Sequence, residues 1–370
     1  MRHGPTRYDL GRNELESVVE EVSPGAPSYR VSQVWDGLHR RLLSPDELTD
    51  LPRPMRAALG NHPALAPALA LDREWETDGG RTRKWVWRLS DGGLIETVLM
   101  HYDASAAHSA RSTVCISTQA GCAMACSFCA TGQAGFDRHL SVGEIVEQVA
   151  RAARAALQVD RKVSRVVFMG MGEPLANYDA TVAAARRMHE DLGLSARHLT
   201  ISTVGVVPGI RRLATEGLPF NLAVSLHAAN DAKRDSLVPL NRRYPLAVLA
   251  AALAAYLEAT HRRLSLEWAL IDGVNDGIDD VRDLAAFARP LGAHVNIIPL
   301  NPTPGYAVMG TPPLRVRRFA EQLEAAGINA TVRKTRGREI DAACGQLAAG
   351  RAVREVGAPV RIGRRRSATT

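Results

Sequence analysis

Three cysteines within eight residues are the part of the sequence best suited to chemistry. Cys122, Cys126 and Cys129 form a C-x3-C-x2-C run on a glycine-flanked segment. Thiolates this close together can surround a compact metal centre. A structural zinc site needs a fourth ligand, usually from a second knuckle or a nearby histidine pair, and neither follows here. The spacing therefore favours a four-iron cluster whose open iron chelates S-adenosylmethionine. A zinc site and a group of merely buried cysteines remain as alternatives.

The two other cysteines lie apart from this cluster. Cys115 precedes it by seven residues, and Cys344 lies far downstream among glycines and charged residues. An odd total of five cysteines argues against a disulfide scaffold. A lone cysteine is ordinarily a small buried hydrophobe, and this interpretation competes with a chemical role at both positions. It is weaker at Cys344, where the surroundings predict a loop.

From about residue 112, short apolar runs alternate with longer helical patterns. A capping box at Ser141 and Glu144 predicts a helix that runs to Leu157. The alternation favours an α/β fold with a parallel sheet and right-handed crossovers, and six or seven units suggest a partial barrel. The predicted strands are residues 113–117, 165–169, 198–202, 220–226, 264–270, 294–299 and 328–333.

The first hundred residues predict a different organisation. Apolar residues recur at helical spacing over residues 29–43, and a capping box at 44–47 predicts the start of another helix. Residues 84–89 and 94–99 flank an Asp-Gly-Gly turn, which is typical of a β-hairpin. We therefore expect a helical accessory domain (1–75), a β-hairpin linker (76–110), a partial barrel (111–345) and a basic C-terminal tail (346–370).

Unusual residues follow the predicted strand ends. The cysteine cluster follows the first strand, a glycine-rich run at 170–174 the second, and the pair Asn301-Pro302 the sixth. In α/β barrels the chemistry is built at the carboxyl ends of the strands. These scattered motifs are therefore expected to converge on one mouth.

The overall charge gives weaker guidance. The chain of 370 residues has a formal net charge of +7 and a pI near 9.4, mostly from arginine. Arginine suits phosphate, so an anionic partner is expected, although a general arginine bias would give the same balance. Neither a membrane-spanning stretch nor a signal peptide is evident in the sequence, so we expect no membrane association and a cytoplasmic location.

Together the motifs resemble the RlmN/Cfr family of radical S-adenosylmethionine RNA methyltransferases, and the RlmN type most closely. The resemblance covers roughly residues 80–350 and implies a partial (β/α)6-type barrel with a small N-terminal helical domain and a β-hairpin extension. The segments that carry it are residues 115–122, 170–175, 202–205, 225–228 and 335–347.

The resemblance also implies roles for single residues. Cys344 would accept a methyl group from one S-adenosylmethionine, and a second one would supply the radical that activates this methyl. Cys115 would resolve the resulting protein–RNA adduct by forming a transient disulfide with Cys344, and Glu96 would accept the proton. Cys122, Cys126 and Cys129 would hold a 4Fe-4S cluster. The expected contacts to S-adenosylmethionine come from Gly172, Glu173, Ser202, Ser225, Leu226, His227 and Asn301.

The implied substrate is carbon 2 of an adenine in the peptidyl-transferase region of 23S rRNA, with an anticodon-stem adenine of tRNA as a second target. The expected electron source is a one-electron donor such as a flavodoxin. Phosphate contacts are expected from the N-terminal domain and the tail. Two alternatives stay open. One is methylation of carbon 8 of the same base. The other is a non-catalytic RNA-binding protein with a structural metal centre.

Overall fold

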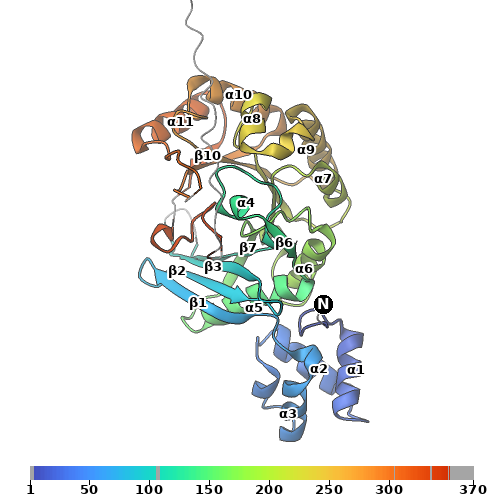
Figure 1. Ribbon diagram of the computed structural model, residues 1–370. Coiled ribbons are helices and arrows are strands. Elements are labelled where there is room, and N and C mark those ends of the chain that lie inside the picture. The colour runs from blue at the N-terminus through green and yellow to red at the C-terminus, as the bar shows by residue number, and fades with distance from the viewer. Residues whose placement is uncertain (1–3, 106–108, 304, 334–335, 349, 351–370) are drawn as a thin grey trace, which may run out of the picture.

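A computed structural model describes residues 4–105, 109–303, 305–333, 336–348 and 350. The arginines predicted as a basic tail beyond residue 350 lie outside the described residues. A single ten-stranded sheet organises this part of the chain, in the order β1-β2-β3-β4-β7-β8-β9-β10-β11-β12. Strands β1 and β12 are its two edges, so the sheet curves around the site without closing (Figure 1).

Seven consecutive strands of this sheet pair in parallel. All seven predicted strands are present, and the predicted bounds of β10 and β11 match the structure. Because parallel strands are buried on both faces, their apolar runs are easy to recognise. The strands are β4 (Arg111–Cys115), β7 (Val163–Phe168), β8 (Leu199–Thr203), β9 (Asn221–Ser225), β10 (Leu264–Leu270), β11 (His294–Pro299) and β12 (Ala330–Val332).

Helices connect these strands and cover the outer face of the sheet (Figure 1). The first, α5, begins after the predicted capping box: Ser141 Oγ accepts from Glu144 N at 3.2 Å, and Glu144 Oε2 accepts from Ser141 N at 2.9 Å. These hydrogen bonds satisfy two backbone N–H groups that have no partner within the helix. The helices are α5 (Val142–Leu157), α6 (Tyr178–Glu190), α7 (Val207–Leu213), α8 (Asp231–Leu237), α9 (Leu246–Thr260), α10 (Ile278–Ala288) and α11 (Pro313–Ala325).

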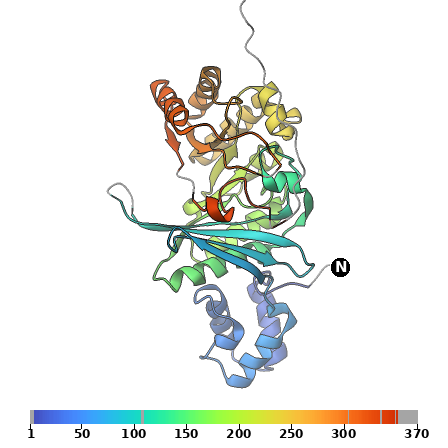
Figure 2. The same cartoon turned by 60° about the vertical axis from the view of Figure 1, so that its left-hand side comes forward.

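Three antiparallel strands extend the sheet beyond β4. The predicted hairpin is β2 (Thr82–Arg88) and β3 (Leu94–Tyr102), and β3 pairs with β4. The additional edge strand β1 (Ala70–Thr77) was not predicted, because its sequence is polar and largely exposed. Figure 2 shows this antiparallel layer between the N-terminal helices and the rest of the molecule.

The N-terminal helices have a hydrophobic cluster of their own. They are α1 (Arg12–Val22), α2 (Tyr29–His39) and α3 (Arg53–Asn61). The capping box predicted at Ser44 forms, but the element that it opens is the 3-10 turn η1 (Pro45–Glu47) and not the expected helix. Prolines delay the next helix until Arg53. Among the described residues no helix is both long and apolar enough to cross a membrane.

Candidate active site

The cysteine cluster lies on a small structure beside the sheet. A two-stranded ribbon, β5 (Gln119–Gly121) and β6 (Phe136–His139), joins the ends of the loop, and the short helix α4 (Ala130–Ala134) begins directly after Cys129. The Cys122 amide donates to the Gly135 carbonyl at 2.7 Å, which closes the loop. Gly132 packs so closely that a Cβ there would lie 3.0 Å from the Cys126 nitrogen. The loop is thus folded tightly around its cysteines.

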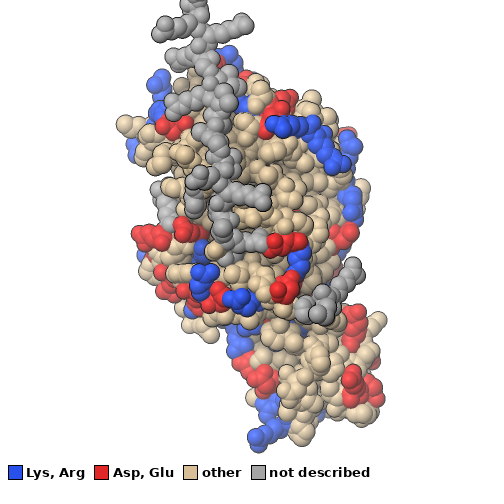
Figure 3. Space-filling model, in the orientation of Figure 1, with Lys and Arg blue, Asp and Glu red and all other residues tan. Residues whose placement is uncertain are grey.

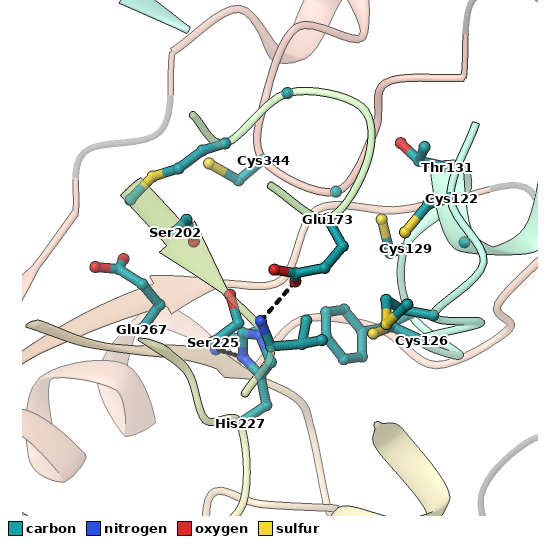
Figure 4. Close-up of a pocket in the computed structure, with 18 of the residues that line it drawn as sticks. Cys122, Cys126, Cys129, Thr131, Glu173, Ser202, Ser225, His227, Glu267 and Cys344 are labelled. Atoms are coloured by element: carbon teal, nitrogen blue, oxygen red, sulfur yellow. Dashed lines mark hydrogen bonds between the residues drawn. The ribbon is translucent and has the colours of Figure 1, made fainter. Parts of the chain in front are cut away.

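All three cysteines line one cavity of about 150 Å³, together with Glu173 and Cys344 (Figure 4). In the described part of the chain no three His, Cys, Asp or Glu side chains converge as ligands of a single metal ion. The three cysteines line the cavity on the loop that carries them, so their thiols are available to a group bound there. Burial raises the pKa of Cys122 to about 12 and also raises the pKa of Cys126 and Cys129. Bound iron would supply the positive charge that buried thiolates need.

The glycine-rich run after β7 forms a second wall of the cavity. At Gly170 a Cβ would lie 2.7 Å from the Ile116 backbone, and Gly172 has a φ of +103°. Glycine is therefore required at both positions, by close approach at one and by conformation at the other. This turn places the Glu173 carboxyl in the cavity wall.

Glu173 is held by the backbone on both of its oxygens. Oε1 accepts from Leu175 N at 3.0 Å and Oε2 accepts from Val204 N at 2.9 Å. Burial nevertheless raises the pKa of Glu173 to about 7. A cationic amino group in the cavity would stabilise the carboxylate and restore a low pKa. The residue therefore fits the role expected from the sequence, a contact to the amino group of S-adenosylmethionine.

His227 is fixed in one tautomer at the end of β9. Its backbone is left-handed, with φ of +59°, and its Nδ1 accepts from Ala269 N at 2.9 Å. Burial lowers the pKa of His227 to about 3, so the ring is neutral and its proton is on Nε2. The Phe128 ring packs edge-on against it at 4.6 Å. His227 therefore presents a fixed neutral N–H donor on a ring that lines the cavity.

Of the remaining residues expected to contact the cofactor, three line the cavity and one does not. Ser202, Ser225 and Asn301 line the cavity, at the ends of three different strands. Leu226 is fully buried in the hydrophobic core and is not among the described residues that line the cavity. The structure thus brings all the predicted contacts except Leu226 to this wall.

The loop that carries Cys344 contributes Cys344 and Gly345 to the wall of the cavity. It docks on the cysteine loop, where Ala130 N donates to the Gly345 carbonyl at 2.8 Å. On another side, Asn301 Nδ2 donates to the Cys344 carbonyl at 3.2 Å. Asn301 therefore holds the backbone of Cys344 directly, and Ala130 holds that of the next residue, Gly345.

A second, smaller cavity adjoins the first, and Cys115 and Cys344 both line it. Both thiols are free. Burial, and then the proximity of Cys344, raise the pKa of Cys115 to about 12, while Arg333 acts in the opposite direction. Cys344 also lines the main cavity, so it is common to both.

Glu96 lies on β3, and its side chain is only 2% exposed. Its Oε2 is 3.1 Å from Lys84 Nζ, and its backbone carbonyl accepts from Ser117 Oγ. Glu96 is close enough to Cys115 to raise the pKa of that thiol. The structure therefore places Glu96 near the two-cysteine cavity rather than in the wall of the main one.

Two charged residues that line the site were not predicted from the sequence. Arg333 lines both cavities, and its pKa is raised above the usual range, chiefly by Cys344. Glu267 lines the main cavity from the middle of β10 and accepts from Asn296 Nδ2 at 2.7 Å. A lone carboxylate inside an otherwise apolar strand was the signal that could have revealed Glu267. Arg333 carries no such signal, because arginine is common throughout this chain.

Comparison with known proteins agrees with this geometry. The Radical SAM superfamily model matches residues 116–288. A protein of Frankia alni named as a probable dual-specificity RNA methyltransferase RlmN is 51% identical over 360 residues, covering 93% of this chain and 84% of the relative. A Nocardioides protein of the same name is 47% identical, with 94% of each chain covered. This chain belongs to the RlmN family.

A solved structure of a radical SAM methyltransferase has the same fold. The radical SAM methyltransferase of Sphaerobacter thermophilus is 47% identical and matches with a TM-score of 0.88 over 94% of this chain and all of that one. Membership of the RlmN family confirms an enzyme of radical SAM methyltransferase type with a partial barrel, a 4Fe-4S cluster and S-adenosylmethionine. The alternative of a non-catalytic protein with a structural metal centre is therefore wrong.

Proposed function

We propose that this enzyme methylates carbon 2 of an adenine in RNA, with Cys344 as the methyl carrier. The observation that carries the proposal is that Cys344 lines both cavities, one with the cluster cysteines and the other with Cys115. A methyl carrier has to meet S-adenosylmethionine on one side and the resolving thiol on the other. The relatives named as RNA methyltransferases support RNA as the substrate.

The main cavity would bind the cofactors through this chain's own residues. Cys122, Cys126 and Cys129 hold the cluster, while Glu173 orients the amino group of S-adenosylmethionine. The cluster and S-adenosylmethionine supply the methyl group and the one-electron chemistry that removes a hydrogen atom from it. His227 presents its fixed Nε2–H donor, and the buried walls exclude water from the reacting atoms.

The two-cysteine cavity would complete the reaction. The methylene carbon on the sulfur of Cys344 bonds to carbon 2 of the adenine, and the adduct would return one electron to the oxidised cluster held by Cys122, Cys126 and Cys129. Glu96 accepts the proton from carbon 2. The Cys115 thiolate then attacks the sulfur of Cys344, the sulfur–carbon bond breaks, and its electron pair stays on carbon, which takes a proton to become the methyl group. A disulfide between Cys115 and Cys344 remains.

The proposed RNA substrates are 23S rRNA, at a peptidyl-transferase adenine, and tRNA, at an anticodon-stem adenine, both in the cytoplasm. Figure 3 shows Lys and Arg side chains over both the barrel and the N-terminal helices, interspersed with acidic residues. We propose that the chain consists of an N-terminal helical domain (1–75), a hairpin linker (76–110), a partial barrel (111–345) and a tail (346–370). The N-terminal domain and the tail would contact the phosphates of the RNA. A flavodoxin-like protein is the proposed electron donor.

The test measures 2-methyl- and 8-methyladenosine by mass spectrometry in RNA from cells lacking the gene, complemented with variants. Loss of 2-methyladenosine that wild type restores and Cys344→Ala does not would support the proposal. Cys115→Ala should accumulate a covalent protein–RNA adduct, whereas Cys122→Ala, which loses a cluster ligand, should form none. Appearance of 8-methyladenosine alone would favour the carbon 8 alternative, and no change in either nucleoside would refute the RNA assignment.

A further inference from the structure

Lys84 is a buried lysine that has no role in the proposed mechanism. It contacts Glu96 and the loop that carries Cys344. Lys84 lies in the middle of β2, and only 5% of its surface is exposed. The segment that leads to Cys344 includes the 3-10 turn η6 (Arg338–Ile340), which packs against β1, where Thr77 Oγ1 donates to Glu339 Oε2 at 3.0 Å.

The ammonium group of Lys84 has two anionic or dipolar partners at hydrogen-bonding distance. Nζ lies 3.1 Å from Glu96 Oε2 and donates to the Asp341 carbonyl at 3.0 Å. It also lies 5.3 Å from the centre of the Trp75 ring. A buried ammonium is strongly disfavoured unless such partners surround it, so the side chain has little freedom to leave this position.

These two partners belong to separate parts of the proposed machinery. Glu96 is the proposed proton acceptor, and Asp341 lies three residues before Cys344 on the same loop. The segment before Cys344 is also attached to the antiparallel strands, because Arg336 Nη1 donates to the His101 carbonyl at 2.7 Å. The bond from Lys84 to Asp341 lies nearer to Cys344 in the sequence, and the same ammonium group holds the carboxylate that acts on the same adduct.

We propose that Lys84 is a positioning residue that holds Glu96 and the Cys344 loop in one geometry. The inference rests on the proposed roles of Glu96 and Cys344. The proton acceptor and the carbon carrier must face the same adenine atom, yet Glu96 and Cys344 are 248 positions apart in the sequence. One ammonium bonded to both sets their relative position without touching the RNA.

An ion pair that only stabilised the fold would behave differently. Its loss would lower the unfolding temperature and the yield of folded enzyme, but each folded molecule would work at the normal rate. A positioning residue instead lowers kcat with little change in KM for RNA. It also lets the covalent protein–RNA adduct persist, because proton removal from carbon 2 becomes slow.

The test compares Lys84→Met, Lys84→Arg and the control Lys162→Met in the cluster-loaded full chain. Methionine is similar in length to lysine but has no charge, whereas arginine keeps the positive charge and the hydrogen-bond donors. Lys162 serves as the control because it is exposed, directly before β7. Activity on an RNA substrate is divided by cluster content, and the adduct is quantified by intact-protein mass spectrometry. We expect Lys84→Met to lower kcat about 10- to 100-fold, since a misplacement of about 1 Å can cost a factor of about 100.

For Lys84→Met we also expect a KM for RNA within about twofold of wild type and accumulation of the adduct. Lys84→Arg should partly restore kcat, and Lys162→Met should behave like wild type. A kcat per cluster within twofold of wild type, with no adduct, would overturn the inference. If Lys84→Met does not retain its cluster, a double-mutant cycle of Lys84→Gln with Glu96→Gln replaces both buried charges together. Fully additive losses in that cycle would also overturn it.

Failure of the proposed function gives a separate signature. In that case wild-type enzyme would not methylate Cys344, or Glu96→Gln would form no adduct. The positioning role of Lys84 fails alone if both of these reactions occur as proposed while Lys84→Met behaves like wild type.

Discussion

Replacing Glu173 with glutamine tests how the cavity recognises its cofactor. Both oxygens of Glu173 accept backbone N–H groups, and the charge is free to meet a cationic amino group. A glutamine has one oxygen and one NH2 group, so it can serve only one of the two donors. The other donor loses its partner in a buried site, which costs about 1–3 kcal/mol of stability.

The effect on binding follows from the lost charge. A hydrogen bond to a charged group contributes about 1.5–3 kcal/mol, so S-adenosylmethionine affinity should fall about 10- to 150-fold. The assay is anaerobic calorimetric titration of cluster-loaded protein with S-adenosylmethionine, and Glu321→Gln on the exposed face of α11 is the control. A dissociation constant within twofold of wild type for Glu173→Gln would refute the assignment of this carboxylate.

The same carboxyl makes binding depend on pH. Its pKa of about 7 lies above the ordinary 4.5, so the folded protein binds this proton more tightly than the unfolded chain. Its effect on folding is therefore a loss of stability as the pH rises from about 4.5 through 7. The ionised fraction rises from about 10% at pH 6 to about 90% at pH 8, so affinity should increase about tenfold over this range. In Glu173→Gln this pH dependence should disappear.

Two substitutions test the packing around the site. Gly170→Ala should lower the free energy of unfolding by about 1–3 kcal/mol, because its Cβ meets the Ile116 backbone at 2.7 Å. Gly60→Ala, whose Cβ would have ordinary contacts in α3, is the control, and an equal loss in both would contradict the argument. Ser141→Ala should cost about 0.5–2 kcal/mol by removing the cap of α5. Denaturant titration measures all three variants, and an unchanged midpoint for Ser141→Ala would show that the cap is unimportant.

The sequence predicted the fold best in segments whose burial produces a recognisable pattern of apolar residues. The seven parallel strands are apolar runs because helices or the cavity walls cover them, and the α5 cap is a local interaction between residues three apart. The polar strand β1 has no such pattern, and only its pairing with β2 makes it a strand. Likewise the capping box at Ser44 formed, but its local preference could not extend a helix into the prolines that follow.

The composition of the site was predictable only in part. The cluster cysteines carry a strong local signal, and the glycine-rich turn by itself carries a weak one. The meeting of Cys344 with Cys115 was expected only from the family resemblance, and the contact of Lys84 with Asp341 was not expected; both join segments more than 200 residues apart. Such contacts depend on how the sheet curves, which short-range patterns do not encode.

The order of strands in the sheet has a consequence for biosynthesis. From β7 to β12 each parallel strand pairs with the one that precedes it in the chain, so the sheet can grow strand by strand as the polypeptide leaves the ribosome. Residues 337–348, which contribute Cys344 and Gly345 to the wall of the cavity, follow all of these strands in the chain. While this segment is still inside the ribosome, that wall is incomplete, and the cluster cysteines are more accessible than in the folded enzyme.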